Sequence, residues 1–442
     1  MRPERVGMMA IGGSAVKPRD GSLAAMALSL ARRIAVSFPA LRHRDFTLLW
    51  IGQLLSFAGS RMQTAAILWH VSLLADPGHK GIALGLVGAV QVVPIIAFSM
   101  LSGVVADALD RRKVMLATQT IMALFAAALA ALTFAGLRVA WPIYLLAALS
   151  SAAASFDGPA RQALIPNLVP REHLASAIGL NTLMFQFASV AGPTLAGLVI
   201  AGPGLPWVYA INAVSFLMVI AALLVMRARS RQATAPTTRI TWTAAREGLR
   251  FVFAQPIVRS TMLLDFAATF FASATALLPI FAQDILHVGA RGYGWLYAAP
   301  SVGAALAGLV MAYAIERIER RGAVLLWAVA AYGAATVVFG ISRSFWLTLL
   351  CLAAVGGADM VSTVIRNIIR QLETPDELRG RMTGVNMVFF MGGPQLGELE
   401  AGVVAQLFGA VTSVVSGGLG CLLTTALVAR REARLRHYRR SE

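Results

Sequence analysis

The segment GVVADALDRRK, residues 103–113, decides the fold of this chain, because it is a short charged turn set between two long apolar runs. From Asp107 to Lys113 it carries two carboxylates and three cations. The apolar runs on either side, 81–106 and 114–137, are each long enough to cross a bilayer as a helix, which takes about 20 residues. A tight, mostly basic turn between two such runs is typical of a cytoplasmic loop in a multi-spanning membrane protein.

The composition of the whole chain indicates the same class of protein. Hydrophobic residues make up 58% of the 442 residues and charged residues only 13%, and the mean hydropathy is +0.71. Soluble domains carry roughly 25% charged residues, so the composition excludes an ordinary soluble fold. Cys351 and Cys421 both lie inside apolar runs, where we expect free thiols and no disulfide.

The hydropathy pattern predicts an all-α membrane protein with twelve transmembrane helices. The predicted spans are 46–75, 81–106, 114–137, 141–164, 174–201, 206–226, 258–286, 293–315, 322–341, 345–368, 382–407 and 410–429, with polar breaks at 166–173 and 371–381. The expected organisation is a cytoplasmic N-terminal tail (1–45), an N-terminal six-helix half (46–226), a cytoplasmic linker (227–257), a C-terminal six-helix half (258–429) and a basic cytoplasmic C-terminal tail (430–442).

Lysine and arginine are distributed very unevenly between the two sides of the predicted membrane. Of the 38 cations, 33 fall in the tails and in every second loop, whereas four (Lys80, Arg138, Arg291 and Arg343) fall in the other loops, and Arg61 lies inside the first span. Cytoplasmic loops carry the excess of Lys and Arg, which predicts that both termini are cytoplasmic. The net charge of +17 is then a mark of topology, and we expect no nucleic-acid partner, because none of the segments presents a folded basic face.

The two predicted halves repeat each other. The aligned pairs include Arg161 with Arg366, Gly192 with Gly397 and Gly197 with Gly402 at an offset of 205 residues, and Gly85 with Gly294 at an offset of 209 residues. The second offset also aligns the opening turn with ERIERR at 316–321, a degenerate second copy. This pattern predicts two halves related by a parallel pseudo-repeat.

The spacing G-x-x-x-D-x-x-D-R-R-K in residues 103–113 resembles the loop between helices 2 and 3 of the major facilitator superfamily. The resemblance is closest to its enterobactin-exporter-like, drug-efflux branch, the transmembrane secretion effectors. It implies a transporter in which charged loops on the cytoplasmic side act in gating. The residues concerned are Gly103, Asp107, Asp110, Arg111 and Arg112 in loop 2–3, Glu316, Glu319, Arg320 and Arg321 in loop 8–9, and the charge partners Arg161 and Arg366.

We expect Asp107 to pair with Arg161 and to face the N-terminus of the eleventh span, whose dipole favours an anion, when the protein opens outward. Glu316 and Arg366 would form the equivalent pair in the second half. The alternative is a solvated charged turn that serves topology alone.

The fifth span carries a second pattern that resembles the superfamily, the motif of its antiporters and exporters. The motif residues are Gly179, Gly192, Pro193 and Gly197, with Ala at two positions usually held by Gly. Small residues on one face let a neighbouring helix approach closely, and a proline permits a bend. The alternative is ordinary close packing of helices.

An ionisable residue inside a predicted span costs roughly 2.5–3.5 kcal/mol and therefore needs a partner or a watery cavity, and six such residues are candidates for a role in transport. These candidates for proton coupling or for the substrate cavity are Arg61, Asp157, Asp265, Asp359, Glu398 and Glu400. We expect Arg61 to pair with Glu398 or Glu400, which lie at a similar depth, and as alternatives we keep an Arg61 that snorkels to the outer surface and solvated caps for Asp157 and Asp265.

The function expected from these residues is secondary active transport. The sequence has no Walker loop, no metal-ligand spacing of His and Cys and no nucleophile elbow, so we expect no enzyme activity, no cofactor and no metal. The resemblance implies a monomer in the inner membrane, surrounded by lipid, that exports a small amphiphilic molecule by alternating access in exchange for protons. The alternatives are an importer or facilitator of the same fold, and a membrane scaffold or receptor that transports nothing.

Overall fold

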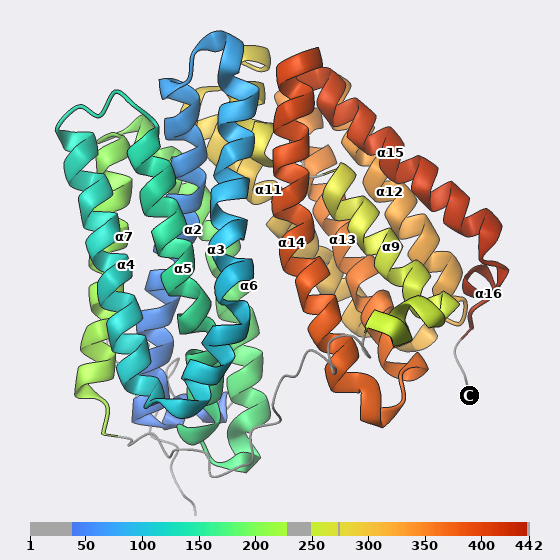
Figure 1. The fold of residues 1–442 in the computed structure, drawn as a ribbon, viewed down its shortest axis with the longest axis horizontal. Coiled ribbons are helices and arrows are strands. Elements are labelled where there is room, and N and C mark those ends of the chain that lie inside the picture. Colours follow the sequence, from blue (N-terminus) through green and yellow to red (C-terminus); the bar gives the residue numbers. More distant parts are fainter. Residues whose placement is uncertain (1–37, 228–248, 273–274, 440–442) are drawn as a thin grey trace, which may run out of the picture.

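The computed structural model describes residues 38–227, 249–272 and 275–439, except for the side chains at 99–100, 103–104, 106–108, 376–377, 379–381, 383–384 and 387–391. In these ranges the chain is helical and contains no β-strand (Figure 1). The N-terminal tail and the linker 227–257 therefore lie largely outside the described residues, and the C-terminal tail is described as far as residue 439.

Twelve long helical segments correspond to the twelve predicted spans. The first half contains α2 (Arg44–Leu74), α3 (Lys80–Ala108), α4 (Arg111–Phe134), α5 (Trp141–Leu164), α6 (Leu174–Ala201) and α7 (Leu205–Val225). The second half contains α9 (Pro256–Phe271), α11 (Gly289–Ala314), α12 (Arg321–Ile341), α13 (Phe345–Glu373), α14 (Asp376–Phe408) and α15 (Ala410–Arg431). The short α10 (Leu278–Ile280) and the π-helical turn η6 (Phe281–Ile285) follow α9 in the chain.

Nine of these segments are long and apolar enough, over their described residues, to cross a membrane. The three others are α2, α5 and α14. Each of the three carries polar residues within its length, among them Arg61 on α2, Asp157 on α5 and Glu398 on α14. Such residues lower the hydropathy of a helix, and they are tolerated where the helix faces protein or water instead of lipid.

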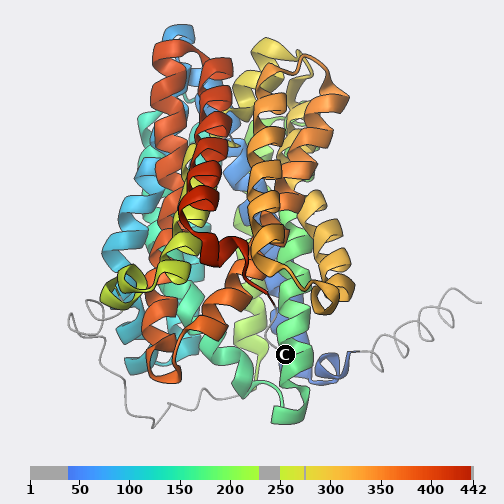
Figure 2. The same cartoon turned by 90° about the vertical axis from the view of Figure 1, so that its right-hand side faces the viewer.

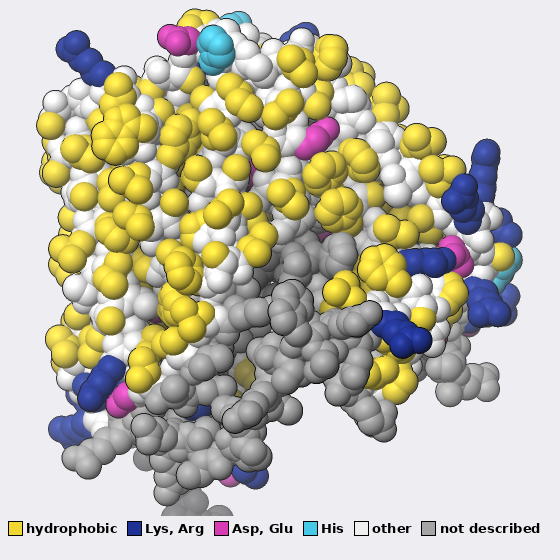
Figure 3. All heavy atoms as spheres, in the orientation of Figure 1, with side chains coloured by type: hydrophobic (Ala, Val, Ile, Leu, Met, Phe, Trp, Pro, Cys, Tyr) yellow, Lys and Arg dark blue, Asp and Glu magenta, His cyan; other side chains and the backbone are white. Residues whose placement is uncertain are grey.

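The two halves stand side by side, and in the view of Figure 1 α12 and α15 of the second half are inclined to the near-vertical helices of the first half (Figures 1 and 2). We call the end that carries Pro39–Arg42 and Ala433–Arg436 the near end, and the opposite end the far end. The principal helix pairs between the halves are α3 with α14 and α6 with α11. On the face shown in Figure 3 apolar side chains cover most of the described surface, and basic side chains lie mainly at its lower left and along its right margin.

The apolar core shows where the halves meet. One cluster of buried side chains, the shared core, draws from both halves and begins on α2 at Met62; it includes Trp69, Leu84, Tyr293 and Ala401. Toward the near end, each half has a separate core of its own. The halves are thus packed together at the far end and have independent interiors at the near end.

The internal repeat reappears as two equivalent contacts between the halves. A Cβ built on Gly402 of α14 would lie 2.7 Å from Gly85 Cα on α3, and one built on Gly197 of α6 would lie 2.9 Å from Gly294 Cα on α11. The repeat relates one contact to the other, because the sequence offsets align Gly197 with Gly402 and Gly85 with Gly294. The predicted pseudo-repeat is confirmed, and its glycines let the helix backbones touch.

One predicted polar break is wrong. Residues 371–381 were expected to leave the helix, but α13 continues to Glu373 and α14 begins at Asp376, so that only Thr374 and Pro375 separate them. Arg370, just beyond the predicted end of the tenth span, is therefore helical, and like Arg366 one turn before it, it is buried.

The glycines of α6 differ in a way that can be tested. Gly197→Ala would place a methyl group 2.6 Å from the Ala290 carbonyl oxygen, so α6 and α11 must separate, and we expect a loss of about 1–3 kcal/mol in stability. Gly179 has nothing within 4 Å, so Gly179→Ala is the matched control and should change stability by less than about 1 kcal/mol. Thermal unfolding in detergent measures both, and equal melting temperatures for the two variants would contradict the assigned contact.

Candidate functional site

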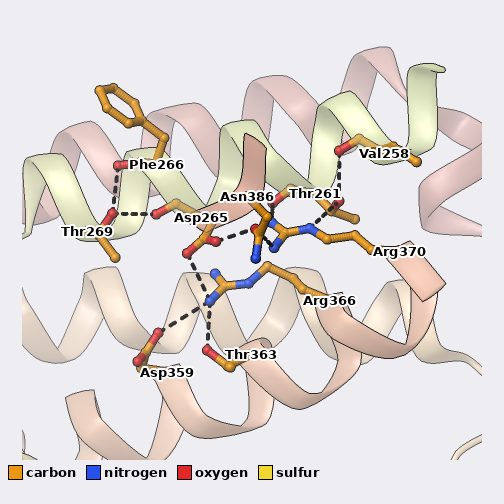
Figure 4. Close-up of polar contacts among 10 residues, drawn as sticks. All are labelled: Val258, Thr261, Asp265, Phe266, Thr269, Asp359, Thr363, Arg366, Arg370 and Asn386. Carbon is orange, nitrogen blue, oxygen red and sulfur yellow. Dashed lines mark hydrogen bonds and ion pairs between the residues drawn. The ribbon is translucent and has the colours of Figure 1, made fainter. Parts of the chain in front are cut away.

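Four charged side chains form a cluster inside the C-terminal half, between α9 and α13 (Figure 4). Asp265 of α9 contacts both arginines of α13: its Oδ1 lies 3.0 Å from Arg366 Nη2, and its Oδ2 lies 3.2 Å from Arg370 Nη2. Arg366 Nη2 also lies 3.5 Å from Asp359 Oδ1. This four-charge cluster balances two carboxylates against two guanidiniums, which a buried group of charges requires.

Helical spacing brings the arginines to one side of α13, because Arg366 and Arg370 are one turn apart. Arg370 donates to the Thr261 hydroxyl from Nε (3.2 Å), to the Thr261 carbonyl oxygen from Nη2 (3.0 Å), and to Asn386 of α14 from Nη1. Arg366 donates to Thr363 (2.8 Å) from Nη2, but its Nε and Nη1 have no hydrogen-bond partner among the described residues. Arg370 is therefore held by side chains and backbone of two other helices, α9 and α14, and Arg366 more loosely.

Asp359 differs from the rest of the cluster in its exposure. Its side chain is 44% exposed, whereas that of Arg366 is 2% exposed. Asp359 lies in the middle of α13, 14 residues from either end. A carboxylate at this depth is too costly to place against lipid, so we infer that Asp359 faces water inside the bundle.

The N-terminal half holds a smaller polar group around Asp157 of α5. Asp157 Oδ1 accepts hydrogen bonds from Thr118 (3.0 Å) and Gln119 (2.9 Å) of α4, and Oδ2 lies 3.9 Å from Arg161 Nη1. Asp157 and Asp265 are both buried, so the alternative that they are solvated caps is wrong. Each joins two helices within its own half.

Arg61 does not form the expected pair with Glu398 or Glu400. Among the described residues Arg61 makes no ion pair, and its guanidinium carbon lies 4.8 Å from the centre of the Phe185 ring on α6. Glu398 faces α3 instead, where a Cβ built on Gly88 would lie 2.8 Å from its Oε2. The two charges are thus at different helix interfaces, with Tyr297 of α11 in electrostatic range of both.

The alternative that Arg61 snorkels to the outer surface is also wrong. Phe185 lies 11 residues after the start of α6 at Leu174, so the guanidinium over it points toward the middle of the bundle. On α2, Arg61 directly precedes Met62, where the shared core begins. Arg61 therefore lies at the inner edge of the packed far end.

The loop 2–3 residues that the structure describes make contacts within the N-terminal half. Asp110 caps α4 by accepting from Arg112 N (2.9 Å), and Arg112 Nη2 reaches the Leu224 carbonyl oxygen of α7 (3.3 Å). Arg111 Nη1 donates to the Ala163 carbonyl oxygen near the end of α5 (2.8 Å). Cations at helix C-termini are stabilising there. The side chains of Gly103 and Asp107 lie outside the described residues, so the Asp107–Arg161 pair stays a prediction.

Loop 8–9 is mostly exposed, as the side chains of Glu316, Glu319 and Arg320 show, and Arg321 is half-buried. The C-terminal segment packs on it, and Gly322 N donates to the Tyr438 carbonyl oxygen (3.1 Å). Arg366 contacts Asp265 and Asp359 rather than Glu316 in this conformation. The Glu316–Arg366 pair concerns an outward-open state and stays a prediction.

Polar contacts between the halves gather at the far end. Lys80 Nζ lies 3.0 and 2.9 Å from the two oxygens of Asp284, and Gln283 Nε2 donates to Ser72 Oγ (2.8 Å). The π-helical turn η6 presents both Gln283 and Asp284 to the first half. Tyr293 donates to the Ala65 carbonyl oxygen (2.8 Å) one turn further in. The described hydrogen bonds and ion pairs between the halves all belong to this end.

The sequence does not predict several residues that take part in these polar contacts. Arg370 lies just beyond the predicted tenth span, 345–368, and Thr261 and Tyr297 are uncharged residues within apolar runs. The signal for Arg370 is its position one turn after Arg366 in a helix that continues. In the described residues, no group of three or more His, Cys, Asp or Glu side chains is arranged to hold a metal ion.

Comparison with known proteins agrees with this architecture. The chain is 26% identical over 400 residues to the enterobactin exporter EntS of Escherichia coli O9:H4 (strain HS), which covers 90% of this chain and 94% of that protein; the EntS of Shigella dysenteriae serotype 1 gives the same values.

Solved structures show the same fold. One is a bacterial homologue of the human lysosomal transporter Spinster in an inward-facing, unoccupied conformation, with a TM-score of 0.69, 15% identity, and coverage of 89% of this chain and 98% of that one. Another is a bacterial homologue of the iron transporter ferroportin in an inward-facing state, with a TM-score of 0.65, 16% identity, and coverage of 88% and 99%. The model of the transmembrane secretion effector family matches residues 35–441, and this chain, a multi-pass membrane transporter without enzyme activity, belongs to that family of the major facilitator superfamily.

Proposed function

We propose that this protein is a proton-coupled exporter that moves a small amphiphilic compound, siderophore-like or drug-like, out of the cell by alternating access. The observation that carries the proposal is the four-charge cluster, in which a 44% exposed Asp359 touches a buried Arg366. Water reaches this carboxylate from one side, and a guanidinium binds it from the other. When the carboxylate takes up a proton from the water, it loses its charge and the ion pair weakens.

The conformation supports a state that opens toward the near end. The shared core and the Lys80–Asp284 pair close the far end, and the separate cores leave the halves unjoined toward the near end. The excess of Lys and Arg supports a cytoplasmic location of the near end. The protein would sit in the inner membrane in a state that loads its cargo from inside the cell.

Similarity to the enterobactin exporters supports export rather than import, and a siderophore-like cargo. The protein would act as a monomer surrounded by lipid, with a small molecule as its partner, no cofactor, and the proton gradient as its driving force.

Proton coupling follows from competition at Asp359. When Asp359 is ionised, Arg366 binds both it and Asp265. When Asp359 takes a proton, the attraction of Arg366 to it falls and Asp265 retains the guanidinium. Uptake of the proton thereby changes the contacts that α13 makes. The protein can then bind cargo and proton in turn, as exchange of one for the other requires.

Proteoliposomes test this function. With the lumen acidic, molecules whose cytoplasmic side faces outward should accumulate cargo in the lumen against its gradient, and a protonophore should abolish the accumulation. Movement of cargo only down its own gradient would identify a facilitator. No movement of any siderophore or drug in a panel, by protein that is folded, would favour a scaffold or receptor.

The charged loop supplies a separate prediction. Asp107→Asn is expected to slow transport while leaving equilibrium binding of cargo unchanged, because Asp107 would hold the cytoplasmic side closed only in the outward-open state. Transport rate and binding affinity are measured on the same preparation. Lys113→Gln, which removes an exposed charge from the same loop, is the control. Equal losses of binding and transport in Asp107→Asn would refute the gating role.

A further inference from the structure

Two arginines and two phenylalanines form a continuous stack on the N-terminal half. The guanidinium carbon of Arg161 lies 4.2 Å from the centre of the Phe57 ring, and that of Arg61 lies 4.8 Å from the centre of the Phe185 ring. The two rings meet edge to face, with centres 5.9 Å apart. We call this stack, Arg161–Phe57–Phe185–Arg61, the cation–ring ladder.

Three helices position the ladder. Phe57 and Arg61 are one turn apart on α2 and so share a face, while Phe185 comes from α6 and Arg161 from α5. Gly192 of α6 fixes the approach, because a Cβ built there would lie 2.5 Å from Arg61 Cβ. The ladder is thus part of the packed framework of the first half.

Packing alone does not account for the arginine at position 61. In the second half, Gly397 makes the equivalent close contact with α9, and the residue there is Phe270, which aligns with Arg61 at the 209-residue offset. An apolar side chain therefore satisfies the same interface. Arg61 keeps its charge at any physiological pH and makes no ion pair among the described residues, so its positive charge is left for another partner.

The ladder is within reach of that partner. Arg61 is partly exposed at the inner edge of the shared core, in electrostatic range of Tyr297 from the other half. Phe185 is 43% exposed although Arg61 and Phe57 both contact its ring. An unpaired guanidinium beside an open ring face offers a site for a negative charge attached to a flat group.

We propose that the cation–ring ladder binds a planar organic anion, with the anionic group on the Arg61 guanidinium and the ring of the ligand against Phe185. The proposal names the substrate class of the transport site and so rests on the proposed function. Its chemistry is the pairing of carboxylate or other oxyanion with a forked donor, combined with stacking between rings.

Equilibrium binding to the full-length protein in lipid nanodiscs tests the proposal without any ion gradient. The probe is radiolabelled 1-naphthoate, with 1-naphthamide and 1-naphthylmethylammonium as unlabelled competitors of the same shape but different charge. Saturable binding of 1-naphthoate is expected, with weak competition by the neutral and cationic compounds. Arg61→Gln should weaken 1-naphthoate binding by about ten- to hundredfold, the size of a hydrogen-bonded charge.

Matched controls separate recognition from folding. Phe185→Leu should weaken binding by about three- to tenfold, whereas Phe187→Leu, two residues along the same helix and 61% exposed, should not change it. Arg343→Gln removes a charge from an exposed far-end loop and should also leave binding intact. The Gln and Leu variants are compared by their melting temperatures, and Arg61→Lys, which keeps the charge without the fork, should bind between wild type and Arg61→Gln.

Absence of saturable 1-naphthoate binding to wild type, or equal affinity for 1-naphthoate and 1-naphthamide, would overturn the proposal. So would unchanged binding in a folded Arg61→Gln variant. Because the assay uses no gradient, a protein that binds 1-naphthoate through Arg61 yet shows no proton-driven transport would contradict the proposed function and leave the anion site standing.

Discussion

Asp265→Asn is expected to lower the free energy of unfolding by about 3–5 kcal/mol, the largest stability effect of any single change considered for this protein. Asp265 bridges Arg366 and Arg370, all three side chains being at most 5% exposed. The amide removes the negative charge between two buried guanidiniums without changing the shape of the side chain. Those guanidiniums cannot lose their protons, so the repulsion remains in the folded state.

The matched control is Asp284→Asn at the far end. Asp284 is also an ion-paired aspartate, but its side chain is 46% exposed, and pairs of this kind contribute about 0–1 kcal/mol. Thermal unfolding of both variants in the same detergent measures the contrast. If Asp265→Asn melted no lower than Asp284→Asn, the four-charge cluster would not hold α9 and α13 together.

Asp359→Asn is expected to abolish accumulation of cargo against its gradient while leaving movement down the gradient in place. The amide neither takes up nor releases a proton, and it makes permanent the weakened contact with Arg366 that protonation makes transient. Transport by the variant should therefore lose its dependence on pH. Efflux assays in proteoliposomes at several values of external pH measure this directly.

Glu398→Gln and Glu400→Gln are the comparisons for that experiment, because both glutamates lie in α14 but outside the four-charge cluster. Loss of pH dependence in one of them as well as in Asp359→Asn would assign the proton to a shared path. If all three variants transported with the pH dependence of wild type, the antiport mechanism would be wrong.

The sequence predicts the helices well and the charge contacts poorly, for different physical reasons. Hydropathy is a local property, so the ends of α5 and α6 are predicted to the residue. The alignment of Gly197 with Gly402 likewise anticipates an equivalent contact in each half.

Partners across helices are not local. Depth alone suggested Glu398 for Arg61, but α14 turns Glu398 toward α3, and α6 receives the guanidinium of Arg61. Rotation of a helix about its axis is set by packing against its neighbours, and hydropathy carries little information about it. Arg370 escaped because the predicted span ends at residue 368, whereas α13 continues to Glu373.

The paired glycine contacts, Gly85 with Gly402 and Gly197 with Gly294, have a mechanical consequence. Each contact brings the backbone of one half directly against the backbone of the other, with no side chain between them. Any motion that separates the halves at the far end must therefore break both contacts, and a bulky side chain at any of the four glycines should wedge that end apart.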